Sequence, residues 1–314
     1  MTSHVSPTSP AAGKATILVL GAGWLWQFLE PALKTAEITY VATTTNGREG
    51  TIPFKFDLEL DGLEEAFKTL PLAEYVLVTF PLKGKGLSRK LVHMYAETHP
   101  QDNSTNSDRA TAETKFIQLG STGIWTSPDF VDSHSPIDPG NERGIAEEEL
   151  ISLGGCVLNL AGLYGAQRQP GNWIARVAKT KEQLGEKGAL HLIHGMDVAG
   201  AVIGVIKTDS QDVDDSGQLF GRRWIVADCV SYDWWSIVWD CNGDSREEDC
   251  RDQEDASQHT RREERSKYRR WVMELMQDKG VKALPRPLEA LGRRLDAREF
   301  WNAVGILPER TLRR

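Results

Sequence analysis

Short apolar runs rich in β-branched residues alternate with segments of helical spacing along the first half of the chain. Such runs predict buried strands, and apolar residues three or four positions apart predict amphipathic helices. The expected strands are 16–20, 38–42, 51–56, 75–80, 115–119 and 156–160, and the expected helices are 24–34, 63–70, 87–98 and 145–153. This alternation predicts an α/β fold, a Rossmann-like doubly wound parallel sheet with helices on both faces.

The pattern becomes irregular beyond the last of these strands. The elements expected there are helices at 173–181, 197–208, 232–240, 268–279 and 297–304 and a strand at 224–227. We therefore expect a sheet domain over 15–165 and a small C-terminal lobe over 166–314, laid over the carboxyl ends of the strands. Within that lobe, 242–265 is charge-dense and poor in apolar residues, which predicts a disordered insertion. Residues 1–14, rich in Ser, Thr, Pro and Ala, are predicted to be a disordered leader, with a targeting role left open.

A Gly-x-Gly turn joins the first strand to the first helix. Gly21 permits a tight turn, Gly23 lets the backbone approach phosphates, and the helix start offers free N–H groups to negative charge. The residues predicted to contact a dinucleotide here are Gly21, Ala22, Gly23, Trp24 and Leu25. The third glycine of this fingerprint is replaced by Trp26, so a protein without a cofactor remains an alternative.

The end of the second strand bears on the choice of dinucleotide. Proteins that bind NAD usually place a carboxylate there, whereas the 2′-phosphate of NADP is accommodated by a basic group. Here Thr43 and Thr44 are followed by Arg48, with no carboxylate before Glu49. This favours NADP over NAD, with Thr43, Thr44 and Arg48 near the 2′-phosphate. The alternative is a polar β-turn closed by 46–47.

Two further strand ends carry candidate site residues. Phe80 and Pro81 take the chain across the expected cofactor position. Ser121 follows the strand at 115–119, where its hydroxyl is predicted to hydrogen-bond a substrate carbonyl. The alternative for Ser121 is to cap the turn that follows it.

The composition of the chain limits which classes of binding partner are expected. The net charge of −8 argues against nucleic acid as the main partner, because phosphate binding requires clustered Lys and Arg. No apolar run reaches the length of about 18 residues typical of a membrane helix. The four cysteines show no metal-binding spacing, which favours a reducing, cytoplasmic location. A small-molecule substrate is expected, and the sequence leaves the oligomeric state undefined.

The order and spacing of several motifs resemble the extended and atypical short-chain dehydrogenase/reductases, the NAD-dependent epimerase/dehydratase group. The matching segments are 21–25, 121–125, 135–139, 148–150, 159–165 and 192–199, with a weaker match at 293–295. The resemblance implies hydride transfer between a nicotinamide and a small carbonyl or alcohol. It also implies a catalytic Ser at Ser121 and a Tyr-x-x-x-Lys pair on the next helix.

That pair is missing here. The alignment puts Arg143 in the place of the Tyr and Glu147 in the place of the Lys. An arginine does not exchange its proton near neutral pH, and a general acid contributes typically about 10²- to 10⁴-fold to rate. A carboxylate at 147 is expected to repel an electron-rich cofactor. Substitute acids are His134, Tyr164 and His194, each of which fits a structural role better. A catalytically silent NADP(H)-binding sensor or scaffold is therefore the alternative function.

Overall fold

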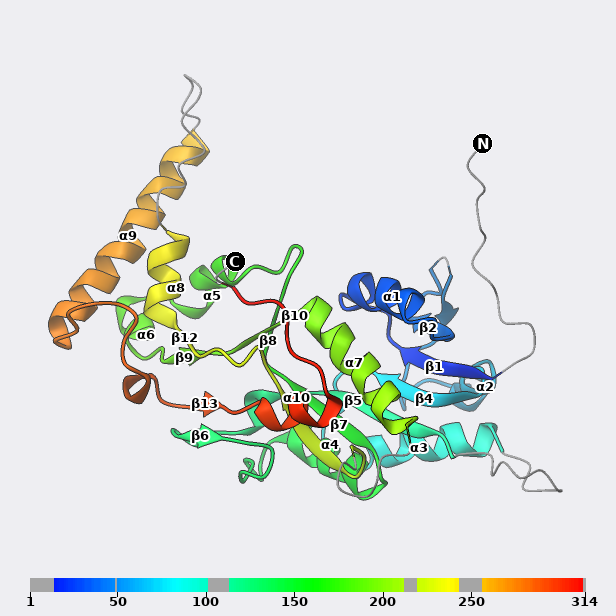
Figure 1. The fold of residues 1–314 in the computed structure, drawn as a ribbon. Helices are drawn as coiled ribbons and strands as arrows, with labels where there is room; N and C mark the ends of the chain where they lie inside the picture. The colour runs from blue at the N-terminus through cyan, green and yellow to red at the C-terminus, as the bar shows by residue number, and fades with distance from the viewer. Residues whose placement is uncertain (1–13, 49, 101–112, 212–218, 243–255, 313–314) are drawn as a thin grey trace.

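A single parallel sheet organises the computed structural model, which describes residues 14–48, 50–100, 113–211, 219–242 and 256–312 (Figure 1). Residues 1–13 of the predicted leader and 243–255 of the predicted insertion lie outside this part of the chain. The strand order is β11-β7-β5-β4-β1-β2-β3, and every neighbouring pair is parallel. The strands are β1 (Ala15–Leu20), β2 (Tyr40–Thr44), β3 (Ile52–Pro53), β4 (Ala73–Val78), β5 (Lys115–Ser121), β7 (Cys156–Leu160) and β11 (Arg222–Val226).

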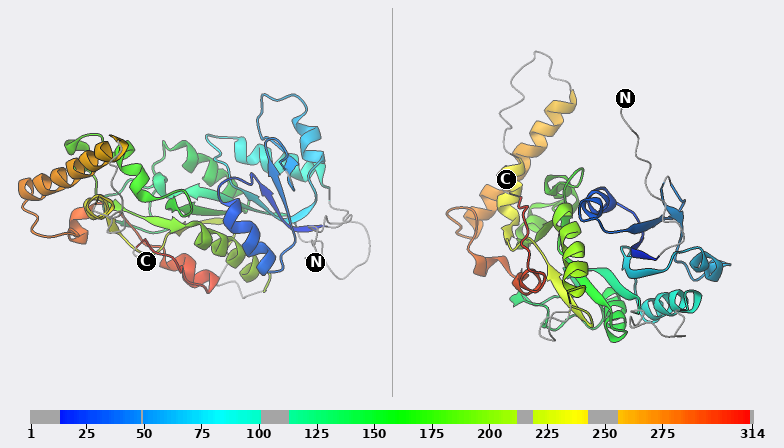
Figure 2. Two further views of the ribbon diagram at one scale, coloured as in Figure 1. Left: turned by 90° about the horizontal axis from the view of Figure 1, so that it is seen from above. Right: turned by 45° about the vertical axis from the view of Figure 1, so that its right-hand side comes forward.

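Helices cover both faces of the sheet, as predicted (Figure 2). Alternate residues of β1 enter two different cores, because successive strand side chains point to opposite faces. Ile17 packs with α1 (Trp26–Thr35), α7 (Gly195–Asp209) and α10 (Arg298–Val304). Leu18 packs on the other face, whose helices are α2 (Leu63–Lys68), α3 (Leu87–Thr98) and α4 (Glu142–Ser152). The doubly wound fold predicted from the sequence is confirmed.

The strand predicted at 224–227 belongs to the main sheet. It forms β11, which pairs with β7 in a register that places Trp224 opposite Leu158. Helix α7 also packs on α1 across the same sheet face. The sheet layer therefore draws on residues from both sides of the expected boundary at 165. A short apolar run predicts a strand but says nothing about which neighbour it pairs with.

Four of the remaining helices lie together at the upper left of Figure 1. These helices are α5 (Ile174–Val177), α6 (Lys181–Gly185), α8 (Trp234–Cys241) and α9 (Ala256–Asp278). The remaining strands form three small two-stranded sheets. These pair β10 (Leu192–His194) with β8 (Gly162–Tyr164), β12 (Tyr232–Asp233) with β9 (Ala189–Leu190), and β13 (Arg294–Leu295) with β6 (Phe130–Val131). No helix in the described part of the chain is long and apolar enough to cross a membrane.

Two expectations for this lobe are corrected. The helix predicted at 173–181 is divided into α5 and α6, which are separate elements. The segment 256–265, predicted to be disordered, forms the first part of α9. Low apolar content excludes a buried core segment, but Arg, Glu and Gln are good helix formers and support a solvated helix.

The buried His191 joins β10 to the C-terminal segment. Its Nε2 accepts hydrogen bonds from the Leu295 N–H (3.2 Å) and the Ser231 hydroxyl (3.0 Å). A proton on Nε2 would face the Leu295 N–H, and burial lowers the pKa of His191 to about 4. The unfolded state therefore binds this proton more tightly, so the stabilising contribution is present above about pH 6.5 and lost as the pH falls to about 4.

We expect this one group to remove roughly 3 kcal/mol from the free energy of unfolding between pH 7 and pH 4. Urea unfolding of the wild type and of His191→Gln at both pH values measures the difference. The exposed His93, changed to Gln, serves as the control. Equal pH dependence in the wild type and His191→Gln would contradict the assignment.

Candidate functional site

A cleft of about 250 Å³ opens at the carboxyl ends of the central strands. Its walls include Gly21 after β1, Thr79 after β4, Ser121 at the end of β5, Arg143 from α4 and Arg168 from the loop after β8. Ligands of doubly wound sheets bind at this edge. The structure thus brings the glycine turn and Ser121, which are far apart in sequence, to one cleft.

The Gly21 turn is held from two neighbouring strands. Gly21 has a φ of +99°, and a Cβ atom there would lie 2.6 Å from Thr79 Oγ1. The Thr79 hydroxyl donates to the Gly21 carbonyl at 2.5 Å, and the Gly21 N–H donates to Thr43 Oγ1 at 3.1 Å. At Gly23, by contrast, a Cβ would meet no atom closer than 3.9 Å. The first glycine is required by the turn itself, and the second leaves open space on its cleft side.

The start of α1 supplies free donors beside this turn. Among the described residues, the backbone N–H groups of Trp24 and Leu25 have no hydrogen-bond acceptor, and both residues line the cleft. The Trp24 Nε1–H is buried and is also without a partner in the described chain. The Arg168 guanidinium lies 4.5 Å from the centroid of the Trp24 ring. Donors and positive charge therefore gather where the sequence predicts a pyrophosphate.

Trp26 has a packing role that explains the missing third glycine. It is the first residue of α1, and its ring meets the Tyr40 ring edge-on at 5.4 Å. It is partly buried against the core on that face of the sheet. The side chain therefore fills the space between helix and strand that a third glycine would leave for closer contact.

The polar residues at the end of β2 and in the turn after it form hydrogen bonds with that turn and with the glycine turn after β1. Thr43 is 1% exposed, and its hydroxyl accepts from Gly21. The Thr44 hydroxyl accepts from the Arg48 N–H at 3.1 Å and lies 2.8 Å from Thr51 Oγ1. The Arg48 side chain donates to the Ala22 carbonyl. The predicted contacts to a 2′-phosphate stay predictions, with Arg48 the cation at this position.

Phe80 and Pro81 lie at the edge of the site. Phe80 stacks on Phe56 with ring centroids 6.2 Å apart, and a Cβ at Gly21 would lie 3.4 Å from its ring. Pro81 is exposed. Neither residue is part of the cleft wall, and their predicted contact with a cofactor remains untested.

Ser121 caps the turn that follows it, and its predicted hydrogen bond to a substrate carbonyl stays a prediction. Its hydroxyl accepts from the Gly123 N–H at 3.2 Å, which caps the 3₁₀ turn Thr122–Ile124, and the residue also lines the cleft. Arg293 donates from Nη1 to the Thr122 carbonyl at 3.0 Å and also to the Trp125 carbonyl. The C-terminal segment thereby holds the turn that directly follows Ser121.

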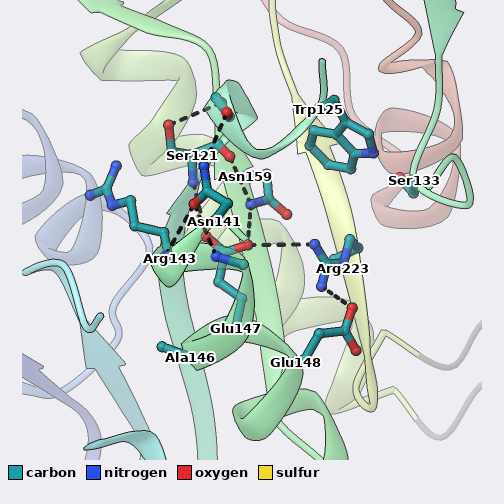
Figure 3. Close-up of polar contacts among 12 residues, drawn as sticks. Ser121, Trp125, Ser133, Asn141, Arg143, Ala146, Glu147, Glu148, Asn159 and Arg223 are labelled. Carbon is teal, nitrogen blue, oxygen red and sulfur yellow. Dashed lines mark hydrogen bonds and ion pairs between the residues drawn. The ribbon is translucent and has the colours of Figure 1, made fainter. Parts of the chain in front are cut away.

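Helix α4 supplies both Arg143 and Glu147, and the Arg143 guanidinium extends away from the Glu147 carboxylate (Figure 3). Asn141 caps the helix by accepting from the N–H groups of Arg143 and Gly144, so Arg143 sits in the first turn and lines the cleft. Glu147 is 1% exposed and is not part of the cleft wall. The carboxylate expected to repel a cofactor is therefore buried beneath the cleft, against the Ser121 N–H.

Glu147 is the centre of a buried polar cluster. Its Oε1 accepts from the Ser121 N–H at 3.2 Å, and its Oε2 accepts from Asn159 Nδ2 at 2.7 Å. Arg223 of β11 lies 3.6 Å from the same Oε2 and also pairs with Glu148. Burial raises the pKa of Glu147, against the lowering influence of Asn159 and Arg223. The cluster ties α4, β5, β7 and β11 together beneath Ser121.

The candidate substitute acids lie outside the cleft wall. His134 is exposed and lies 3.1 Å from Glu299. His194 accepts from the Met196 N–H at the start of α7, and burial lowers its pKa. Tyr164 is buried against His194, and burial raises its pKa far above neutrality. The cleft wall itself contains no side chain that exchanges a proton readily near pH 7. Among the described residues no group of metal-ligating side chains occurs either.

Solved structures share this fold across nearly the whole chain, although no family model and no curated protein matches it. UDP-glucuronic acid 4-epimerase from Bacillus cereus, in complex with NAD, has a TM-score of 0.54 at 13% identity, covering 95% of this chain and 94% of its own. A short-chain dehydrogenase/reductase superfamily protein from Agrobacterium tumefaciens with bound NAD has a TM-score of 0.54 at 12% identity, covering 94% and 93%. Gre2 from Candida albicans has a TM-score of 0.53 at 11% identity, covering 95% and 96%. At these identities the similarity establishes the fold.

Proposed function

We propose that the protein binds a nicotinamide dinucleotide and acts as an atypical oxidoreductase on a small carbonyl or alcohol. The observation that carries this proposal is the Gly21 turn, whose positive φ and contact with Thr79 leave no room for a side chain. The unpaired N–H groups of Trp24 and Leu25 beside it suit a pyrophosphate. Two solved structures of the same fold carry NAD, which agrees with this choice of ligand class.

NADP is the preferred dinucleotide in this proposal, with NAD the less favoured. No carboxylate follows β2 before Glu49, which lies outside the described residues. Arg48 lies against the glycine turn through its contact with the Ala22 carbonyl. A guanidinium at that place favours a ligand with an additional phosphate, since Arg binds phosphate through paired hydrogen bonds.

In the proposed reaction, the residues of the cleft bind and orient the substrate. A bound nicotinamide would supply or accept a hydride. Ser121 would orient the substrate oxygen, and Arg143 would offer charge stabilisation without giving up a proton. Water entering the cleft would provide the proton, because the cleft wall holds no acid suited to that step.

A silent dinucleotide-binding protein is the second candidate. The specific observation in its favour is the same cleft wall, in which Arg143 stands where an acid would be needed. Such a protein would bind the dinucleotide through the Gly21 turn and report or transmit the bound state. Both candidates require binding, and only the first requires turnover.

Titration of NADPH and NADH against tryptophan emission separates these possibilities. Trp24 lines the cleft, so dinucleotide binding is expected to quench its emission until the site is saturated. We expect the affinity for NADPH to be higher than the affinity for NADH. Oxidation of NADPH with small carbonyl compounds then distinguishes the oxidoreductase from the silent protein. Saturable binding without oxidation across a broad carbonyl panel would favour the silent protein. No saturable change with either dinucleotide would overturn both candidates.

A further inference from the structure

Two arginines and no carboxylate line the candidate cleft. Arg143 enters from the first turn of α4, and Arg168 enters from the loop after β8. Neither guanidinium forms an ion pair with any residue that the structure describes. Glu147 of α4 pairs with Arg223 and accepts from Asn159, and Arg143 acts on it only as a more distant charge. Both guanidinium groups of the cleft therefore keep their hydrogen-bond donors for a ligand.

The two arginines occupy different parts of the cleft. Arg168 stacks on Trp24 beside the glycine turn, where the proposed dinucleotide phosphates would lie. Arg143 instead extends on the same side of β5 as the Ser121 hydroxyl (Figure 3). In the fold at hand, Ser121 lies at the end of the strand next to β4, away from the turn after β1. This placement assigns Arg168 to the cofactor side and Arg143 to the substrate side.

We infer that Arg143 binds an anionic group of the substrate, so that the substrate is a small carbonyl compound carrying a carboxylate. This inference rests on the proposed function for its carbonyl chemistry. The planar guanidinium matches a carboxylate through two parallel hydrogen bonds. The first turn of α4 adds the positive end of the helix dipole. The cleft of about 250 Å³ limits such a substrate to a small molecule.

Oxamate and oxamide provide a matched pair of probes, because they have similar shape and only oxamate carries a negative charge. Each is titrated by calorimetry against the protein alone and against the protein saturated with NADPH. We expect oxamate to bind at least tenfold more tightly than oxamide. In Arg143→Gln we expect oxamate binding to weaken at least tenfold, with NADPH affinity changed less than twofold.

Arg176→Gln is the control for the change in net charge, since Arg176 is exposed on α5 and outside the cleft wall. Its oxamate affinity should equal that of the wild type. Thermal unfolding checks that Arg143→Gln stays folded, and Arg143→Lys, which keeps the charge, should retain part of the oxamate affinity. Equal binding of oxamate and oxamide to the wild type would overturn the inference.

These measurements distinguish a role of Arg143 in binding the dinucleotide phosphates from a role in binding the substrate carboxylate. If Arg143→Gln weakens NADPH at least tenfold and leaves oxamate unchanged, Arg143 serves the dinucleotide phosphates, and the inference is wrong. If neither dinucleotide binds but oxamate binds the protein alone through Arg143, the proposed function fails while the anion site stands. If neither dinucleotide nor oxamate binds, both fail.

Discussion

The Gly21→Ala variant is expected to bind NADPH at least tenfold more weakly than the wild type, which corresponds to at least about 1.4 kcal/mol of binding free energy. The φ of +99° is unfavourable for any residue with a Cβ, and that atom would also lie 2.6 Å from Thr79 Oγ1. Relief of this contact must move Thr79 or the turn, and either change disturbs the backbone that faces the cleft. Tryptophan quenching by NADPH measures the loss.

Gly86 provides a closely matched control. Its φ is +98°, yet a Cβ there would meet no atom within 4 Å, and the residue does not line the cleft. Gly86→Ala therefore carries the same backbone strain without the contact and without the site. We expect it to lower the free energy of unfolding while leaving NADPH affinity unchanged. Equal NADPH affinity in Gly21→Ala and the wild type would show that the turn does not hold the dinucleotide.

The Glu147→Leu variant is expected to lower the free energy of unfolding by about 3 to 5 kcal/mol. Glu147 is 1% exposed and Arg223 is 6% exposed, so removal of the carboxylate leaves a buried guanidinium whose remaining ion-pair partner among the described residues is Glu148. The Asn159 amide also loses its acceptor at 2.7 Å and keeps the Ser121 carbonyl at 3.2 Å. Urea unfolding at pH 7 measures the change.

A double-mutant cycle tests the cause. Because an apolar pair of similar volume often replaces a buried ion pair at little cost, Glu147→Leu/Arg223→Leu should regain at least half of the lost free energy. A cost below about 1 kcal/mol for Glu147→Leu, the range of exposed pairs, would show that the cluster contributes little. Additive costs in the double variant would show that the two residues act independently.

The local features of the fold could be predicted from the sequence. The apolar run before Gly21 and the helical spacing after it determine β1, the turn and α1 within a few residues, because they depend on neighbours in the chain. The seven-residue strand β5 extends to Ser121, two residues beyond the expected 115–119, since the polar end of a strand carries no apolar signal. The edge of the sheet that holds the cleft follows from this order of elements.

Features that depend on distant pairing could not be predicted. The sequence predicts that the Glu147 carboxylate repels a cofactor. The structure pairs this carboxylate with Arg223, which lies far along the chain on a strand whose place in the sheet is not encoded locally. The hydroxyls of Thr43 and Thr44 accept hydrogen bonds from the Gly21 and Arg48 N–H groups, which the sequence does not indicate, and their contacts to a 2′-phosphate stay predictions. The place of Arg143 in the cleft wall likewise depends on the fold, since the sequence does not indicate that the carboxylate at 147 is paired with Arg223.

The position of β11 has a consequence for the synthesis of the protein. A chain that has emerged from the ribosome only as far as residue 165 contains six of the seven strands but lacks the edge strand Arg222–Val226 that pairs with β7. Without that strand β7 presents an unpaired edge, and Glu147 lacks its ion-pair partner Arg223. One late strand therefore supplies both the cover for the sheet edge and the partner for the buried carboxylate.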